Sequence, residues 1–141
     1  RFPAKGGSLL NDPPGSVARG LKWLLRLQGS YFLLAGIWPL VHMPSFLDVT
    51  GDKVELWLVR TVGCLVIAVG AGLLTTRPQP LPPFSINLIA VLSAAGLAAI
   101  DIVYVVQGVI RPVYLGDALI EVVFIAWWIA LFIKAGSMGQ R

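Results

Sequence analysis

The sequence predicts an all-α integral membrane protein: one bundle of four spanning helices with both termini in the cytoplasm. Of its 141 residues, 57% are hydrophobic and 13% are charged, whereas about 25% of the residues of a soluble domain are charged. The mean hydropathy is +0.81. Four apolar stretches of about 20 residues are each long enough, at 1.5 Å per residue, to cross a hydrocarbon core of roughly 30 Å.

The first half of the chain predicts a tail and two spans. Residues 1–20 are rich in proline and glycine, a composition typical of a tail. The first span covers 21–41 and ends at Pro39 and a turn at Pro44. After a polar loop, the second span covers 54–74. The polar side chains near the start of the first span, Lys22, Arg26 and Gln28, are expected to reach the lipid headgroups.

The second half predicts two further spans. Residues 77–83 hold four prolines and form a stiff linker that cannot be helical. The third span covers 85–106, a tight turn follows, and the fourth span covers 113–133. The bundle domain therefore covers 21–134, and 135–141 form a second tail.

The distribution of basic residues predicts the orientation. Four crossings place both tails and the 77–83 linker on one side, which holds eight of the eleven basic residues and is therefore cytoplasmic by the positive-inside rule. These eight are Arg1, Lys5, Arg19, Lys22, Arg26, Arg77, Lys134 and Arg141. Because they are scattered singly, nucleic acid is not an expected partner.

Ionisable residues at similar depth in the outer half of the spans predict a buried charge cluster. Arg60 is in the second span, Asp101 in the third, and Asp117 and Glu121 lie four residues apart in the fourth. Because a charge inside the bilayer costs roughly 2.5–3.5 kcal/mol, such residues should face the bundle interior and pair. Candidate residues lining a pocket beside the cluster are Trp38, Tyr104, Tyr114 and Asn87.

Three interpretations of this cluster stay open. In the first, Arg60 is a structural clasp that locks three helices together. In the second, three carboxylates against one guanidinium leave an acidic pocket open to the outer side, able to bind a cation, a proton or a polar, lipid-like ligand. The third is a catalytic acid–base pair.

Other candidate residues carry weaker signals. Gly63 and Gly70 predict a close-packing face on the second span. His42 is a candidate axial ligand for a pigment magnesium or a haem iron, the alternative being an interfacial hydrogen bond. Cys64 is the only cysteine, so cysteines cannot build a metal site or an intrachain disulfide. Because phosphate-binding loops, Ser-His-Asp sets and zinc motifs are absent, we expect no enzyme.

Three segments suggest a family: residues 56–63 (LWLVRTVG), residues 100–104 (IDIVY), and residues 111–115 (RPVYL) followed by Asp117 and Glu121. They resemble a group of small, uncharacterised bacterial four-helix membrane proteins and, more distantly, the DoxX-like group. The resemblance implies a four-helix bundle in the bacterial inner membrane. DoxX-like proteins are linked to quinone or thiol redox systems, but paired cysteines are missing from this chain.

The expected function is that of a non-catalytic accessory or assembly subunit of a larger bacterial membrane complex, photosynthetic or respiratory. The Pro/Gly-rich tails would dock against other membrane-protein subunits, and a free-standing transporter would usually need more helices. The alternative is a small ligand-binding or transport protein that uses the acidic outer-leaflet pocket. We expect bound lipid and no required cofactor, and neither a pigment nor a quinone is indicated.

Overall fold

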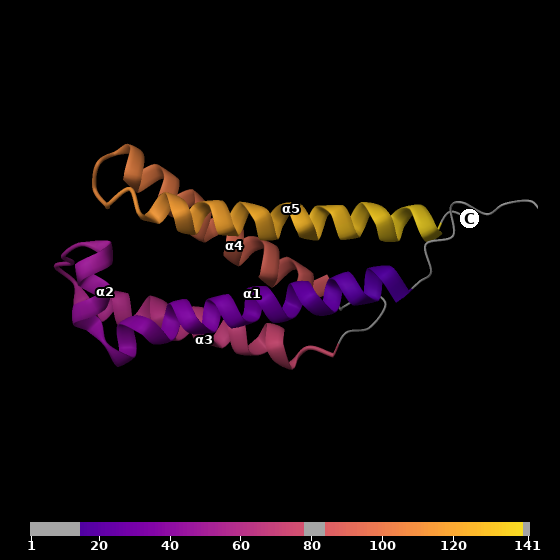
Figure 1. The fold of residues 1–141 in the computed structure, drawn as a ribbon, viewed down its shortest axis with the longest axis horizontal. Helices are drawn as coiled ribbons and strands as arrows, with labels where there is room; N and C mark the ends of the chain where they lie inside the picture. Colours follow the sequence, from indigo (N-terminus) through magenta and orange to yellow (C-terminus); the bar gives the residue numbers. More distant parts are fainter. Residues whose placement is uncertain (1–14, 78–83, 140–141) are drawn as a thin grey trace, which may run out of the picture.

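The computed structural model describes residues 15–77 and 84–139, which form five helices in an elongated bundle (Figure 1). They are α1 (Gly15–Val41), α2 (Met43–Thr50), α3 (Leu56–Thr75), α4 (Phe84–Val106) and α5 (Tyr114–Gly139). All except α2 are long and apolar enough to span a membrane. The predicted all-helical chain with four long apolar helices is confirmed.

The two ends of the bundle differ. The start of α1 and the end of α5 lie together at one end, the tail end (Figure 1). The short helix α2 and the turn 107–113 lie at the other, the α2 end. In that turn Gly108 adopts φ +72°, a left-handed conformation that glycine allows without steric cost.

The helices extend further than the sequence predicted. Residues 15–20, predicted as tail, form the first turns of α1, where Val17 is buried in the core. Residues 135–139 continue α5. The predicted polar loop contains α2, which begins after His42, whose ring Nδ1 accepts a hydrogen bond from the Ser45 N–H. The remaining tail residues and the proline linker lie outside the described residues.

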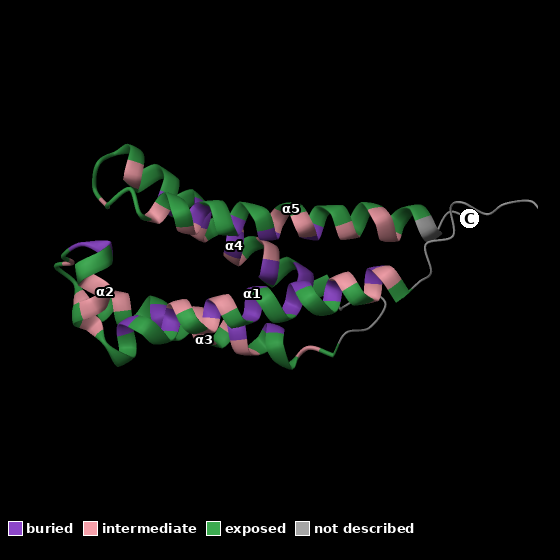
Figure 2. Ribbon diagram, viewed as in Figure 1, coloured by how far each residue is buried: buried purple, intermediate pink, exposed green. Residues whose placement is uncertain are grey.

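The four long helices pack as two pairs, α1 with α3 and α4 with α5. The first pair meets through glycines. Gly29 faces Gly70, and Gly36 faces Gly63, so closely that a Cβ on Gly70 would lie 2.8 Å from the Gly29 carbonyl oxygen. Small residues at such crossings let helix backbones approach and pack closely in a membrane. The outer faces of the helices are exposed (Figure 2).

A hydrophobic core joins the two pairs toward the tail end. Its larger buried side chains are Leu21, Leu24, Leu25, Leu73, Phe124 and Trp128. Fully buried among them, Gln28 donates from Nε2 to the Ala90 carbonyl oxygen at 2.9 Å and accepts from the Trp128 indole N–H at 2.8 Å. The prediction that Gln28 reaches the headgroups was wrong: it is the fourteenth residue of α1, too deep to do so.

Replacing Gly70 by alanine should destabilise the bundle, whereas the same change at Gly72 on the same helix should not. A Cβ at Gly70 would meet the backbone of α1, and overpacking of this kind costs about 1–3 kcal/mol. Nothing lies within 4 Å of a Cβ at Gly72. Thermal unfolding of the two variants in detergent tests this expectation, and equal melting temperatures would contradict it.

Candidate functional site

Two cavities lie between the helix pairs near the α2 end. The larger, the α1–α5 cavity, has a volume of about 730 Å³ and is lined by residues of α1, α2 and α5. The smaller, the α3–α4 cavity, has a volume of about 360 Å³, and α3 and α4 contribute much of its lining. We call the two together the crevice, because they share lining residues. The shared residues are Tyr31, Ala35, Phe46, Tyr114 and Asp117.

The inner face of α4 carries small residues. Its buried residues between Asn87 and Asp101 are Ala90, Ala94 and Ala98. The bulky leucines, Phe124 and Trp128 fill the space toward the tail end. At the α2 end the gap between the pairs is lined mostly by aliphatic and aromatic side chains, with three carboxyl groups among them.

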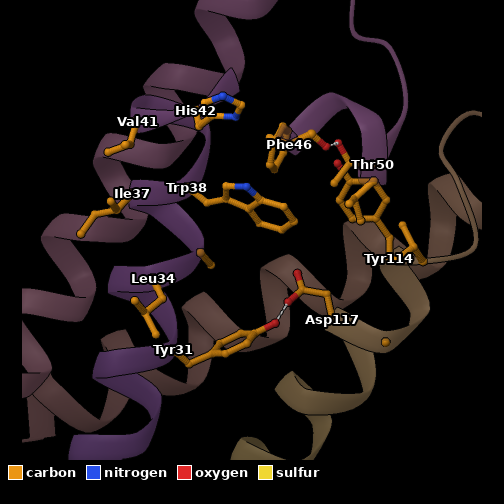
Figure 3. A pocket seen from close by; sticks show the side chains of 14 residues that line it. Tyr31, Leu34, Ile37, Trp38, Val41, His42, Phe46, Thr50, Tyr114 and Asp117 are labelled. Carbon is orange, nitrogen blue, oxygen red and sulfur yellow. Dashed lines mark hydrogen bonds between the residues drawn. The ribbon is translucent and has the colours of Figure 1, made fainter. Parts of the chain in front are cut away.

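Three carboxyl groups line the α3–α4 cavity. Asp101 comes from α4, and Asp117 and Glu121 come from successive turns of α5. Glu121 is fully buried and Asp101 is 6% exposed. Tyr31 of α1 donates a hydrogen bond from its hydroxyl to Oδ1 of Asp117 (Figure 3). Both carboxyl oxygens of Glu121, and Oδ2 of Asp101, are buried without a hydrogen-bond partner.

The prediction that Arg60 belongs to this cluster was wrong. Its side chain is exposed, and it lines neither cavity. The buried face of α3 is narrow, with only Gly63, Gly70 and Leu73 buried among its residues, so a side chain one turn before Gly63 points outside the bundle. Because Arg60 is the fifth residue of α3, its long side chain is close enough to the helix end to reach the headgroups.

The four predicted lining residues divide into two groups. Trp38 and Tyr114 line the α1–α5 cavity (Figure 3). Tyr104 is 43% exposed on α4 and lines neither cavity. Asn87 is buried on the same face of α4 as Asp101, but fourteen residues away, which is about 21 Å along a helix. The prediction that Tyr104 and Asn87 line this pocket was therefore wrong.

His42 lies at the rim of the α1–α5 cavity, at the junction of α1 and α2 (Figure 3). Its Nδ1 atom accepts a hydrogen bond from the Ser45 N–H at 3.2 Å, which caps α2. In the described residues, groups of three or more His, Cys, Asp or Glu side chains that could hold a metal ion are absent. Because Nδ1 is engaged in the hydrogen bond from the Ser45 N–H, an axial ligand from His42 would have to be its Nε2 atom.

Contacts from α2 and from the loop after it bridge the helix pairs at the α2 end. Arg111 donates from Nη1 to the Asp48 carbonyl oxygen at 2.8 Å. The Lys53 ammonium lies 5.0 Å from the centroid of the Tyr114 ring and donates to the Thr50 carbonyl oxygen at 3.0 Å. Partial burial lowers the pKa of Lys53, and the nearby charge of Arg111 acts in the same direction. This bridge covers the crevice on the side facing away from the tail end.

Sequence reasoning missed Tyr31, the α1 residue that donates a hydrogen bond to Asp117. The available signal was a hydroxyl deep inside a span, seventeen residues into α1, because a buried hydroxyl in hydrocarbon needs a partner. No protein-family model, curated protein or solved structure significantly matches the chain. The functional argument therefore rests on the geometry of the crevice.

Among the described residues, the ionisable side chains that line the crevice include acids and no lysine or arginine. The carboxyl groups offer hydrogen-bond acceptors. The rest of the lining is mostly apolar or aromatic. The crevice can therefore accommodate a largely apolar molecule whose polar group donates hydrogen bonds.

Replacing Tyr31 by phenylalanine should destabilise the fold, because it removes the donor to Asp117 and leaves another carboxyl oxygen unpartnered. We expect a loss of about 1–3 kcal/mol. Thermal unfolding in detergent measures the loss. Tyr104→Phe makes the same change at an exposed position and should have no effect, so equal losses in the two variants would refute the role of Tyr31.

Proposed function

We propose that the protein is a small membrane protein that binds an amphiphilic molecule in the crevice, with the apolar body between the helix pairs and the polar group at the acids. The observation that carries the proposal is Glu121, which is fully buried beside the α3–α4 cavity with both carboxyl oxygens unpartnered. An unpaired buried carboxyl group costs stability. Such a cost is repaid if a bound ligand supplies the missing partner.

The size of the crevice supports this proposal. Sites for small molecules are usually concave, mostly apolar and about 300–1,000 Å³ in volume, with a few polar groups that fix orientation. The α1–α5 cavity, at about 730 Å³, falls in that range. Its polar side chains are few: Tyr31, Trp38, His42, Thr50, Tyr114 and Asp117 (Figure 3).

Side-chain exposure supports entry from the lipid rather than from water. Leu34 and Val41, at the rim of the α1–α5 cavity, are 69% and 77% exposed. At the rim of the α3–α4 cavity, Val62 and Ile100 are 49% and 56% exposed. In a bilayer these apolar rims would face the acyl chains. The Arg111 and Lys53 contacts lie across the end that would face water.

We place the protein in a bacterial inner membrane, with the tail end cytoplasmic. The basic residues concentrated near the termini and the 77–83 linker support that orientation, and the resemblance to bacterial four-helix membrane proteins supports the membrane. The crevice would then lie in the outer leaflet.

The accessory-subunit role stays a prediction. It depended on the tails docking against other subunits, and most of the tail residues lie outside those that the structure describes. A stoichiometric set of larger subunits that co-purifies with the chain would support that role instead.

The binding proposal predicts an amphiphilic molecule that co-purifies with the protein. Protein purified from its native membrane in mild detergent should yield, on solvent extraction and mass spectrometry, one such molecule enriched over the bulk lipid. Glu121→Gln should reduce the enrichment at least about tenfold, because it replaces one of the two acceptor oxygens by an NH₂ donor, which does not pair with a donor on the ligand. Glu55→Gln makes the same change at an exposed residue before α3 and should leave it intact.

Two results would contradict the proposal: an extract that contains bulk lipid alone, or equal enrichment in both variants. Thermal unfolding of each variant shows whether Glu121→Gln is folded. Where it is not, Asp117→Asn is the second variant, because Asp117 is only partly buried and lines both cavities.

A further inference from the structure

We infer that the ligand is a lipophilic amine, bound as its ammonium form and taken up in exchange for one proton from a crevice carboxyl group. This inference rests on the proposed binding function and specifies the chemistry of the ligand. Its basis is the set of unpartnered buried oxygens on Glu121 and Asp101, together with the charges and rings that surround them.

The first argument is the supply of donors. The unpartnered atoms are both oxygens of Glu121 and Oδ2 of Asp101, and all are acceptors when the carboxyl groups are ionised. A primary ammonium group has three N–H donors and no acceptor. A hydroxyl group offers one donor, and a carboxylate offers none. An ammonium group is therefore the head group that satisfies most of these oxygens at once.

The second argument is the charge of every group that faces the acids. Tyr31 faces them from α1, Asp101 lies on α4, and Asp117 and Tyr114 lie with Glu121 on α5. His42 stands at the rim, where α1 meets α2. The α3 residues that line the α3–α4 cavity are all uncharged: Leu58, Val59, Val62, Gly63 and Val66. The crevice thus favours a cation and repels an anion.

The third argument is the lining of the wider part of the crevice. Tyr31, Trp38, Phe46 and Tyr114 line the α1–α5 cavity, and the Trp38 and Phe46 rings meet edge to face at 5.6 Å between centroids. Ring faces attract ammonium groups within about 6 Å, and they pack well against apolar bodies. The same walls therefore accept both parts of a lipophilic amine.

The exchange step follows from the cost of unbalanced charge in hydrocarbon. Because the crevice walls carry no lysine or arginine among the described residues, a carboxyl group there has a lower free energy when protonated than when ionised without a bound cation. When the ammonium enters, the O–H bond of one carboxyl group breaks, the proton leaves to water, and an N–H···O⁻ ion pair forms. The reaction is R–NH₃⁺ + R′–COOH → R–NH₃⁺···⁻OOC–R′ + H⁺, so the net charge of the crevice stays at zero.

The test uses three probes with the same apolar body: 4-phenylbutylamine, 4-phenylbutan-1-ol and 4-phenylbutanoate. Titration calorimetry with the full chain in lipid nanodiscs, with empty nanodiscs as the partition control, measures each Kd. We expect the amine to bind at least about tenfold more tightly than the alcohol, and the carboxylate not to bind. Titration of the amine at pH 7 in two buffers of different ionisation enthalpy should show release of about one proton per amine.

Variants locate the site. Glu121→Gln should weaken binding of the amine at least about tenfold while changing that of the alcohol little, because only the amine uses the negative charge. Glu55→Gln should change neither. Asp101→Asn, which keeps the shape of the side chain, is the second variant if Glu121→Gln does not fold.

The outcomes separate the two proposals. If the alcohol binds as tightly as the amine, the ammonium inference is overturned while binding in the crevice stands. If the amine binds without releasing a proton, the exchange step is overturned. If none of the three probes binds, both the inference and the proposed function fall.

Discussion

The buried amide of Gln28 fixes where the two helix pairs meet. It donates to the backbone of α4 and accepts from Trp128 of α5, so one side chain of α1 ties the first pair to both helices of the second. An unsatisfied amide in hydrocarbon costs several kcal/mol, and sliding any of the three helices by one turn would break this arrangement. The leucines and Trp128 that pack around it fill the space toward the tail end. The rest of the architecture follows from having this joint in one half of the bundle.

Beyond the joint, the hydrogen bond from Tyr31 to Asp117 and the contacts of Arg111 and Lys53 connect the two pairs, while the closest packing lies within each pair. Glycines bring α1 and α3 into backbone contact at Gly29–Gly70 and again at Gly36–Gly63. On α4 the inner face carries alanines between Asn87 and Asp101. The acids lie in this half because a lipid-facing carboxyl group would cost more than one that faces a cavity. Arg60 escapes the same constraint, since its long side chain extends from a helix end toward water.

Local properties of the chain made the four spans predictable from sequence. Length and hydropathy decide whether a segment crosses a bilayer, and both are read without knowing its neighbours.

Which face of a helix meets which neighbour depends on tertiary packing. A helical wheel placed Arg60 close to Gly63, but the buried strip of α3 is too narrow to include it. Spacing by sevens placed Asn87 and Asp101 on one face, as the structure has them, without indicating that the crevice ends before Asn87. Gln28 and Tyr31 needed partners more than sixty residues away, which a local pattern does not reveal.

Because Arg60 is not part of the cluster, the acids cannot act as a structural clasp between helices. A structural clasp requires a cation between the helices, because carboxyl groups alone repel when ionised and offer little cohesion when protonated. Here the donor from the opposite pair is the Tyr31 hydroxyl, which donates to Asp117. Both carboxyl oxygens of Glu121 and Oδ2 of Asp101 have no hydrogen-bond partner. All three acids belong to α4 and α5, so their repulsion when ionised acts within that pair. The two pairs are joined at the α2 end by the Tyr31 hydrogen bond to Asp117 and by the Arg111 contact to α2. A cation beside the acids would reverse the sign of the interaction between α4 and α5 and draw these two helices together. Occupancy and stability of the bundle would then be linked, since whatever binds the folded form alone stabilises it.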